Sequence, residues 1–185
     1  LTEVHCVFLH HGFNDSYNVT SGEGEFIFRV YRYSWRTYEE ILAETRYLLY
    51  LHRQGVDLSI PVAGVNREFV IGMKAPEGMR YGVLFTKAQG NIPIEFSNEL
   101  SGKLGTTLAC IHGLSDSWKE QAERPVLDIS FLVSEPLEAL HRAFPHRTQQ
   151  LEMLTRRLAP IVTEVDSITR QPPNFGLIHG DYLQV

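Results

Sequence analysis

The first third of the chain has the hydrophobic patterns of β-strands: an apolar run, a short β-prone stretch, and a stretch in which residues alternate with β-branched and aromatic ones. Gly12 and the stretch from Ser21 to Gly24 supply turn residues between the first three apolar stretches. Three strands joined so closely predict an antiparallel meander, and two more strands are predicted further along the chain. The five stretches are 4–9, 17–20, 25–31, 69–73 and 82–86.

Helical periodicity first occurs after residue 37. Thr37 and Glu40 have the spacing of a capping box, in which the Thr side chain caps a backbone N–H and the Glu side chain reaches back. Apolar residues then recur at intervals of about 3.6 residues. The pattern predicts a helix that ends near Gly55.

Two later apolar stripes predict helices, from Leu100 to His112 and from Leu151 to Ile168. Gly113 is expected to end the first helix as its C-cap. Pro160 is expected to kink or split the second. The last segment, 176–181, is expected to be a short strand that enters a loop.

The strand-rich and helical parts predict an α+β fold with two lobes. The first lobe is expected at residues 1–88 and the second at 89–185, with a short connector near Gln89, Gly90 and Asn91. The first lobe should hold an antiparallel sheet of five strands and one helix. The second should be mainly helical.

Composition and charge limit the class of protein, the partners and the cellular location that the sequence predicts. The chain is 43% hydrophobic and 21% charged, with a net charge of −5 and a pI of about 5.9, which predicts a globular protein and neither a nucleic-acid nor a membrane partner. No apolar run approaches the roughly 20 residues that span a bilayer. Cys6 and Cys110 form no disulfide framework, and with no signal peptide this favours a cytoplasmic location.

The most informative segment is His179-Gly180-Asp181, which follows a short apolar run. It resembles the catalytic loop of the aminoglycoside phosphotransferase and choline kinase family, which has His-Gly-Asp where protein kinases have His-Arg-Asp. The resemblance implies that Asp181 accepts the proton of an attacking hydroxyl. The alternative is a glycine turn in which Asp181 accepts local backbone N–H bonds.

The upstream order of motifs is also similar to that of the family. The stretch from Phe26 to Arg32 resembles the third strand of a kinase N-terminal lobe, where a basic residue faces the nucleotide phosphates and pairs with a Glu on the next helix. Arg29 takes the place of the usual Lys, and Glu44 lies where the partner is expected. The alternative is that both are ordinary solvated charges.

Two further segments match the family by position. The stretch from Val83 to Gly90 resembles the hinge, so the resemblance implies that the Thr86 carbonyl and the Ala88 N–H hold adenine. The hairpin turn that contains Asn14 and Ser16 resembles the family's phosphate-binding turn. For this turn, simple turn chemistry is the alternative.

The resemblance implies a protein-kinase-like fold and transfer of the γ-phosphoryl group of ATP to a hydroxyl, with GTP as an alternative donor. An aminoglycoside, an amino alcohol such as choline, homoserine and a protein Ser or Thr all remain open as acceptors. Leu183 stands where the family commonly has His. A kinase-like protein that binds without turnover is therefore the alternative.

The chain stops four residues after Asp181, where the family's metal-binding Asn would come next. We therefore expect truncation within the catalytic loop and Mg²⁺ ligands beyond the given residues. By itself the chain is expected to be inactive. Self-association is a further expectation, because the apolar stripe from Leu151 to Ile168 would be partly uncovered.

Overall fold

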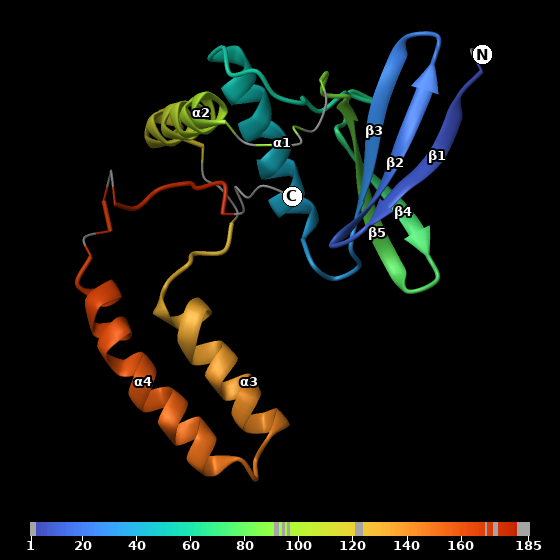
Figure 1. Ribbon diagram of the computed structural model, residues 1–185. Coiled ribbons are helices and arrows are strands. Elements are labelled where there is room, and N and C mark those ends of the chain that lie inside the picture. The colour runs from blue at the N-terminus through green and yellow to red at the C-terminus, as the bar shows by residue number, and fades with distance from the viewer. Residues whose placement is uncertain are drawn as a thin grey trace. The chain divides into compact units, whose positions relative to one another are not determined.

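The computed structural model describes residues 3–90, 93, 95, 97–120, 124–168, 170–171 and 174–180. The chain divides into two compact units, 1–123 and 124–185. The described part of the first unit holds a sheet and two helices, and that of the second holds helices (Figure 1). This division follows packing, and the lobe boundary predicted between residues 88 and 89 stays a prediction.

The sheet has five antiparallel strands in the order β1-β2-β3-β5-β4, as the sequence predicts. The first three strands form a meander joined by short turns. The last two form a second hairpin whose strand β5 pairs with β3. The strands are β1 (His5–His11), β2 (Asn14–Ser21), β3 (Gly24–Tyr31), β4 (Val70–Ala75) and β5 (Gly78–Thr86).

The strand register decides which side chains share a face of the sheet. Ser16 pairs with Arg29, and Arg29 pairs with Val83, so these three side chains lie on one face. Asp15 pairs with Val30, and neighbouring positions along a strand point to opposite faces. The sheet therefore separates Ser16 and Arg29 from Asp15.

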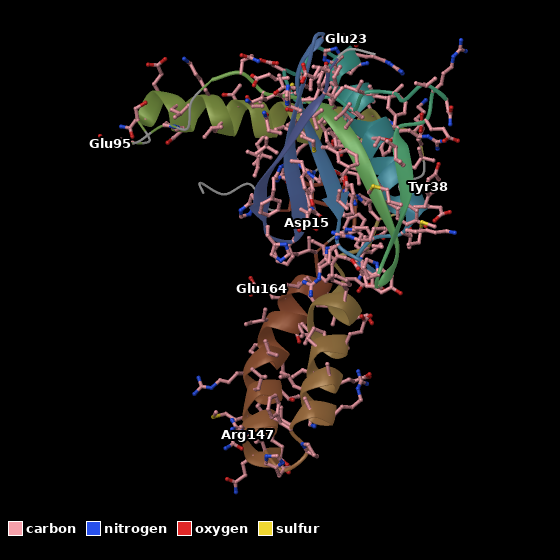
Figure 2. The ribbon with its side chains drawn as sticks, turned by 90° about the vertical axis from the view of Figure 1, so that its right-hand side faces the viewer. Asp15, Glu23, Tyr38, Glu95, Arg147 and Glu164 are labelled. Carbon is pink, nitrogen blue, oxygen red and sulfur yellow. The ribbon has the colours of Figure 1, made fainter. Side chains whose placement is uncertain are left out.

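Helix α1 (Tyr38–Arg53) packs its apolar side chains against the sheet. The predicted capping box is present: Glu40 N donates to Thr37 Oγ1 over 3.1 Å, and Thr37 N donates to Glu40 Oε2 over 2.8 Å. Tyr38 stands at the start of the helix (Figure 2), and its ring meets that of Tyr81 edge to face at 5.6 Å. The buried core cluster consists of Tyr31, Ile41, Val70, Val83 and Phe85.

The helix α1 ends where the sequence predicts. Gln54 is its C-cap, and Gly55 follows with a φ of +87°. A residue in this left-handed region is most often glycine, because a side chain there is strained. Gly55 N donates to His52 O over 2.9 Å, which satisfies one of the last carbonyls of the helix.

Helix α2 (Asn98–Ser117) is longer than predicted. The expectation that Gly113 ends it is wrong, because the helix continues to Ser117 with Trp118 as its C-cap. The last turn is held by contacts to α1, including a hydrogen bond of 3.0 Å from the Tyr50 hydroxyl to Leu114 O. These tertiary contacts outweigh the low helix propensity of one glycine.

The second unit holds a π-helical turn η1 (Ser130–Ser134) and helices α3 (Glu135–Ala143) and α4 (Thr148–Asp166). The expected split at Pro160 does not occur, since α4 runs through it. Pro160 is exposed, so the carbonyl that loses its N–H partner can bind water instead. The sequence did not predict η1 and α3.

The expected strand at 176–181 is wrong for its described part, 176–180, which has no regular secondary structure. A segment of five residues becomes a β-strand only when a neighbouring strand supplies hydrogen-bond partners. No described strand pairs with this segment. Among the described residues, no helix has both the length and the apolar character that a membrane span requires.

Candidate functional site

Arg29 and Glu44 form an ion pair between strand β3 and helix α1. Arg29 Nη1 lies 3.6 Å from Glu44 Oε1, and the side chains are 39% and 19% exposed. The Arg29 guanidinium also lies over the ring of Phe85, 5.0 Å from its centroid, a cation–π arrangement. The predicted pairing of these two residues is thus confirmed, and the exposed fraction of Arg29 leaves the guanidinium accessible from solvent.

Tyr31 is a third member of this cluster that the sequence analysis did not identify. Its hydroxyl donates to Glu44 Oε1 over 3.1 Å. Burial raises the pKa of Tyr31, and the Glu44 carboxylate raises that pKa further, so the hydroxyl stays a donor. Tyr31 follows Arg29 by two residues and therefore shares its face, a signal that the sequence contains.

The β1–β2 hairpin brings Ser16 beside Arg29, because the two are direct partners in the register. Asn14 opens β2, and its side-chain oxygen accepts a hydrogen bond of 3.3 Å from Arg32 N. The Asn14 side chain thus fastens the turn to the end of β3. Whether Ser16 and Asn14 approach a phosphate group, as predicted, stays a prediction.

The predicted hinge, 83–90, begins in the last residues of strand β5 and continues beyond the end of that strand. Thr86 N donates to Ile60 O over 2.9 Å, and Ile60 N donates to Thr86 Oγ1 over 3.0 Å. These two hydrogen bonds fix the end of β5 against the segment that precedes β4. Ala88, two residues later, is exposed and outside regular structure. The predicted contacts of Thr86 and Ala88 with adenine stay predictions.

Asp181 lies outside the described residues, so its predicted role stays a prediction. His179 and Gly180, which precede it, are described, and Gly180 has a φ of +77°. The described residues contain no group of three His, Cys, Asp or Glu side chains that could hold a metal ion.

Arg80 and Asp15 form a second ion pair that the sequence analysis missed. Arg80 Nη2 lies 2.6 Å from Asp15 Oδ2, and the two side chains are only 18% and 14% exposed. His11 Nδ1 lies 2.5 Å from the other Asp15 oxygen. The His11 hydrogen bond and then Arg80 lower the pKa of Asp15, although partial burial opposes them. No local sequence signal links residues that are 65 positions apart.

Two bacterial proteins resemble the chain over almost its whole length. An uncharacterised protein of Synechocystis sp. is 30% identical over 177 residues, which are 95% of this chain and 49% of that protein. An uncharacterised protein of Deinococcus radiodurans is 29% identical over 98% of this chain and 52% of that protein. The chain thus spans about half the length of the relatives it matches.

Solved structures of kinases share the fold. A microcompartment-associated aminopropanol kinase aligns with a TM-score of 0.79 at 23% identity, over 98% of this chain and 58% of that one. An amicoumacin kinase, solved in complex with AMP-PNP, Ca²⁺ and Ami, gives 0.72 at 18% identity over 89% of this chain and 49% of that one. A spectinomycin phosphotransferase gives 0.51 at 13% identity, over 97% and 58%. The α+β, protein-kinase-like fold class is therefore confirmed.

A comparison with sequence models of protein families identifies the family. The sequence model of the phosphotransferase enzyme family matches residues 5–184, which include the ion pair of Arg29 and Glu44, the hinge and the His-Gly-Asp segment. The resemblance noted from these motifs is confirmed. The chain belongs to the phosphotransferase enzyme family.

Proposed function

We propose that the full-length natural protein transfers the γ-phosphoryl group of ATP to a hydroxyl group of a small molecule. The observation that carries this proposal is the Arg29–Glu44 pair at 3.6 Å. A cation paired with a helix Glu is the arrangement with which kinases engage the nucleotide phosphates. Family membership supports the same reaction class.

Arg29 would engage the phosphate oxygens of the nucleotide. Its guanidinium is a planar fork that fits phosphate geometry and stays charged at every working pH. Glu44 holds that fork, and Tyr31 in turn donates a hydrogen bond to Glu44. Thr86 and Ala88 would offer a backbone carbonyl and an N–H to adenine at the end of β5.

Asp181 would act on the acceptor. Its carboxylate would orient the attacking hydroxyl and take its proton as the new bond to the γ-phosphorus forms. The bond between that phosphorus and the bridging oxygen breaks, and ADP leaves with the electron pair. Positioning and charge neutralisation supply most of the rate, since little covalent work falls to the protein.

The acceptor that we propose is a small amino alcohol or a larger amine-bearing compound such as an aminoglycoside, with homoserine as a further member of the panel. One similar structure is an aminopropanol kinase, and another is an amicoumacin kinase. For the cofactor we propose ATP, with GTP as the alternative and with Mg²⁺ held by residues outside these 185. The 185 residues by themselves are proposed to be inactive, since they span about half of the relatives' length.

The test is a transfer assay on the full-length protein with ATP and with GTP against a panel of hydroxyl compounds. Asp181→Asn should lower kcat by about 10²- to 10⁴-fold and leave nucleotide affinity nearly unchanged, as expected for loss of a general base. Arg29→Met should instead weaken nucleotide binding. Arg142→Met, which removes an exposed cation of α3, is the matched control and should change neither quantity.

Two results would contradict the proposal. Wild-type turnover in Asp181→Asn would remove Asp181 from the reaction. Nucleotide binding without transfer to any compound of the panel would favour the kinase-like binding protein instead.

A further inference from the structure

We propose that Asp15 and Arg80 are positioning residues that hold the β1–β2 hairpin in place for binding of the nucleotide phosphates. The inference rests on the function proposed above and extends it to two residues outside the predicted site. We refer to this ion pair as the Asp15–Arg80 clamp. Neither residue is among the site residues that the sequence predicts.

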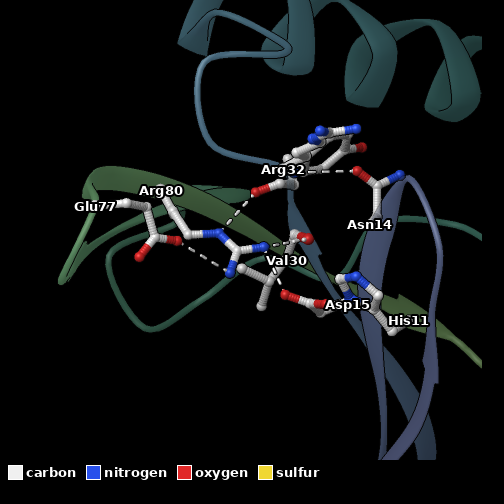
Figure 3. A network of polar contacts seen from close by, with 8 residues as sticks. His11, Asn14, Asp15, Val30, Arg32, Glu77 and Arg80 are labelled. Carbon is white, nitrogen blue, oxygen red and sulfur yellow. Dashed lines mark hydrogen bonds and ion pairs between the residues drawn. The ribbon is translucent and has the colours of Figure 1, made fainter.

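Arg80 lies at the centre of a network of polar contacts (Figure 3). Its Nη2 binds Asp15 Oδ2 at 2.6 Å, and its Nε donates to Tyr31 O over 3.1 Å. A longer contact of 3.4 Å joins Nη2 to Val30 O, and Glu77 Oε1 lies 3.5 Å from Nη1. Four contacts hold the guanidinium in one orientation, and Arg80 thereby fixes the position of Asp15.

The clamp joins parts of the sheet that are distant in sequence. Arg80 belongs to β5, its two carbonyl partners belong to the end of β3, and Asp15 belongs to the start of β2. It therefore ties the hairpin tip to the β4–β5 hairpin across the end of β3. Asp15 stands between Asn14 and Ser16, so fixing Asp15 also fixes the backbone of both predicted phosphate-binding residues.

The clamp acts from the far side of the sheet. Asp15 pairs with Val30, whereas Ser16 pairs with Arg29, so Asp15 and Ser16 point to opposite faces. A nucleotide held by Arg29 would lie on the Ser16 face. The clamp would then influence binding through the backbone of the hairpin rather than by touching the ligand.

Besides the backbone ladder between β2 and β3 and the contact of His11 with Asp15 inside the hairpin, two other side-chain contacts join the hairpin tip to the rest of the chain, and both are more exposed than the clamp. The Phe13 and Trp35 rings stack at 5.9 Å, but these residues are 67% and 53% exposed. Asn14 contributes its hydrogen bond from Arg32 N. The clamp is the shortest and best-shielded of the three, and charge-assisted hydrogen bonds of this length are stronger than neutral ones. We therefore assign it the main part in fixing the tip.

The direction in which Asp15→Asn changes nucleotide affinity distinguishes a positioning role from a purely electrostatic effect. Asp15 is an anion near the expected site of an anionic ligand. Asp15→Asn removes its negative charge while keeping its shape, so long-range electrostatics alone predicts tighter nucleotide binding. Loss of the clamp predicts the reverse, because a hairpin tip that is held by fewer contacts loses more conformational freedom when the nucleotide binds.

The experiment compares Asp15→Asn, Arg80→Met and the double variant in the full-length protein. ATP KM, acceptor KM and kcat are measured, and binding of AMP-PNP is followed by calorimetry. Each single variant should weaken AMP-PNP binding and raise the ATP KM by about 10-fold, within the range that misplacement of a binding group causes. The acceptor KM should stay unchanged. The double variant should lose no more than the stronger single one, because both remove one interaction.

Arg36→Met is the matched control. Arg36 pairs with Glu40 at 3.1 Å, and its side chain is 29% exposed, so the variant removes a cation of comparable burial that does not contact the hairpin. It should leave the ATP KM unchanged. Thermal unfolding of every variant shows whether it is folded at the assay temperature, and the isosteric Asp15→Asn decides the question if Arg80→Met does not fold.

Unchanged or tighter AMP-PNP binding by Asp15→Asn would overturn the clamp while leaving the proposed function intact. An equal loss in Arg80→Met and Arg36→Met would do the same. A wild-type protein that binds neither AMP-PNP nor a GTP analogue would overturn the proposed function, and the role of the clamp with it.

Discussion

Glu44 serves two partners at once. It accepts a hydrogen bond from the buried Tyr31 and pairs with the partly exposed Arg29. An exposed ion pair contributes little by itself, on the order of 0–1 kcal/mol. The main effect of Glu44 is therefore on the orientation of Arg29. Its carboxylate is fixed by Tyr31 and limits the orientations that the Arg29 guanidinium can adopt.

Tyr31→Phe tests this view at one atom. The variant removes only the hydroxyl, and we expect the free energy of unfolding to fall by about 1 kcal/mol, the usual value of one hydrogen bond. The kcat/KM for ATP should fall by about 5-fold, which corresponds to about 1 kcal/mol. Urea unfolding and steady-state kinetics measure both. An unchanged kcat/KM would mean that Arg29 needs no help from Tyr31.

Asp15 predicts a pH dependence of stability. Because its pKa is lowered from the ordinary value of 3.8 in the folded state, its stabilisation is fully present above pH 3.8 and is lost as the pH falls through the lowered pKa. Asp15→Asn should thus cost about 1 to 2 kcal/mol near pH 7, between the values for exposed and buried ion pairs. Urea unfolding from pH 7 down to pH 3 should show the gap between the two proteins narrowing only at the acid end. A gap that stays constant to the lowest pH would contradict the assignment.

The sequence predicts one of the two ion pairs and not the other. Arg29 and Glu44 could be paired because a resemblance to the family assigns a strand cation to a helix Glu. Asp15 and Arg80 belong to no such motif, and only the strand order β2-β3-β5 brings them together. Contacts that depend on non-local strand pairing leave no trace in local periodicity.

At the scale of elements, aromatic side chains join α1 to α2. The Trp118 ring lies 4.9 Å from the Tyr47 ring and 6.4 Å from that of Tyr50. The Tyr47 hydroxyl and the buried Ser115 hydroxyl are hydrogen-bonded to each other. Burial raises the pKa of Tyr47, although its bond to Ser115 works in the opposite direction. The end of α2 is thereby fastened to the helix that carries Glu44.

Trp118→Ala should lower the free energy of unfolding by about 2 kcal/mol, because it removes a partly buried ring from this cluster. Trp35→Ala is the matched substitution at a more exposed position and should cost about 0.5 kcal/mol or less. Denaturant unfolding followed by far-UV circular dichroism measures both. Equal losses would show that the aromatic cluster does not fasten α2.

Elements with strong local signals were predictable. The capping box fixed the start of α1, and apolar or β-prone stretches bounded by turn residues located all five strands, although β2 and β5 are longer than expected. The errors arose where tertiary contacts decide, as at Gly113, which α2 runs through. The turn η1 and helix α3 were not predicted either.

At the scale of the whole molecule, the described residues of the proposed nucleotide site all belong to one compact unit. Asn14, Ser16, Arg29, Glu44, Thr86 and Ala88 fall within residues 1–123. Helices α3 and α4 belong to the other unit. Binding of a nucleotide should therefore reduce backbone motion in the first unit and leave the backbone of α4 unchanged.

Hydrogen exchange measured by mass spectrometry can test this expectation on the full-length protein. AMP-PNP should slow exchange in peptides that cover 12–16 and 84–90, because backbone groups there are expected to contact the ligand or to be ordered by it. Peptides from α4 serve as the internal control and should exchange at the same rate with and without AMP-PNP. Protection confined to α4 would contradict the assigned site.

The strand order also has a consequence for how the chain folds. Short turns join β1 to β2 and β2 to β3, whereas β5 reaches β3 only after α1 and β4 have been laid down between them. Local pairings close small loops and form early, and non-local pairings form late. We therefore expect pulse-labelling during refolding to protect amides of β2 before those of β5; simultaneous protection would contradict this order.

Because the clamp joins β2 to β5, the polar network around Arg80 would then be completed only in the final step of folding, when the second hairpin docks on the meander.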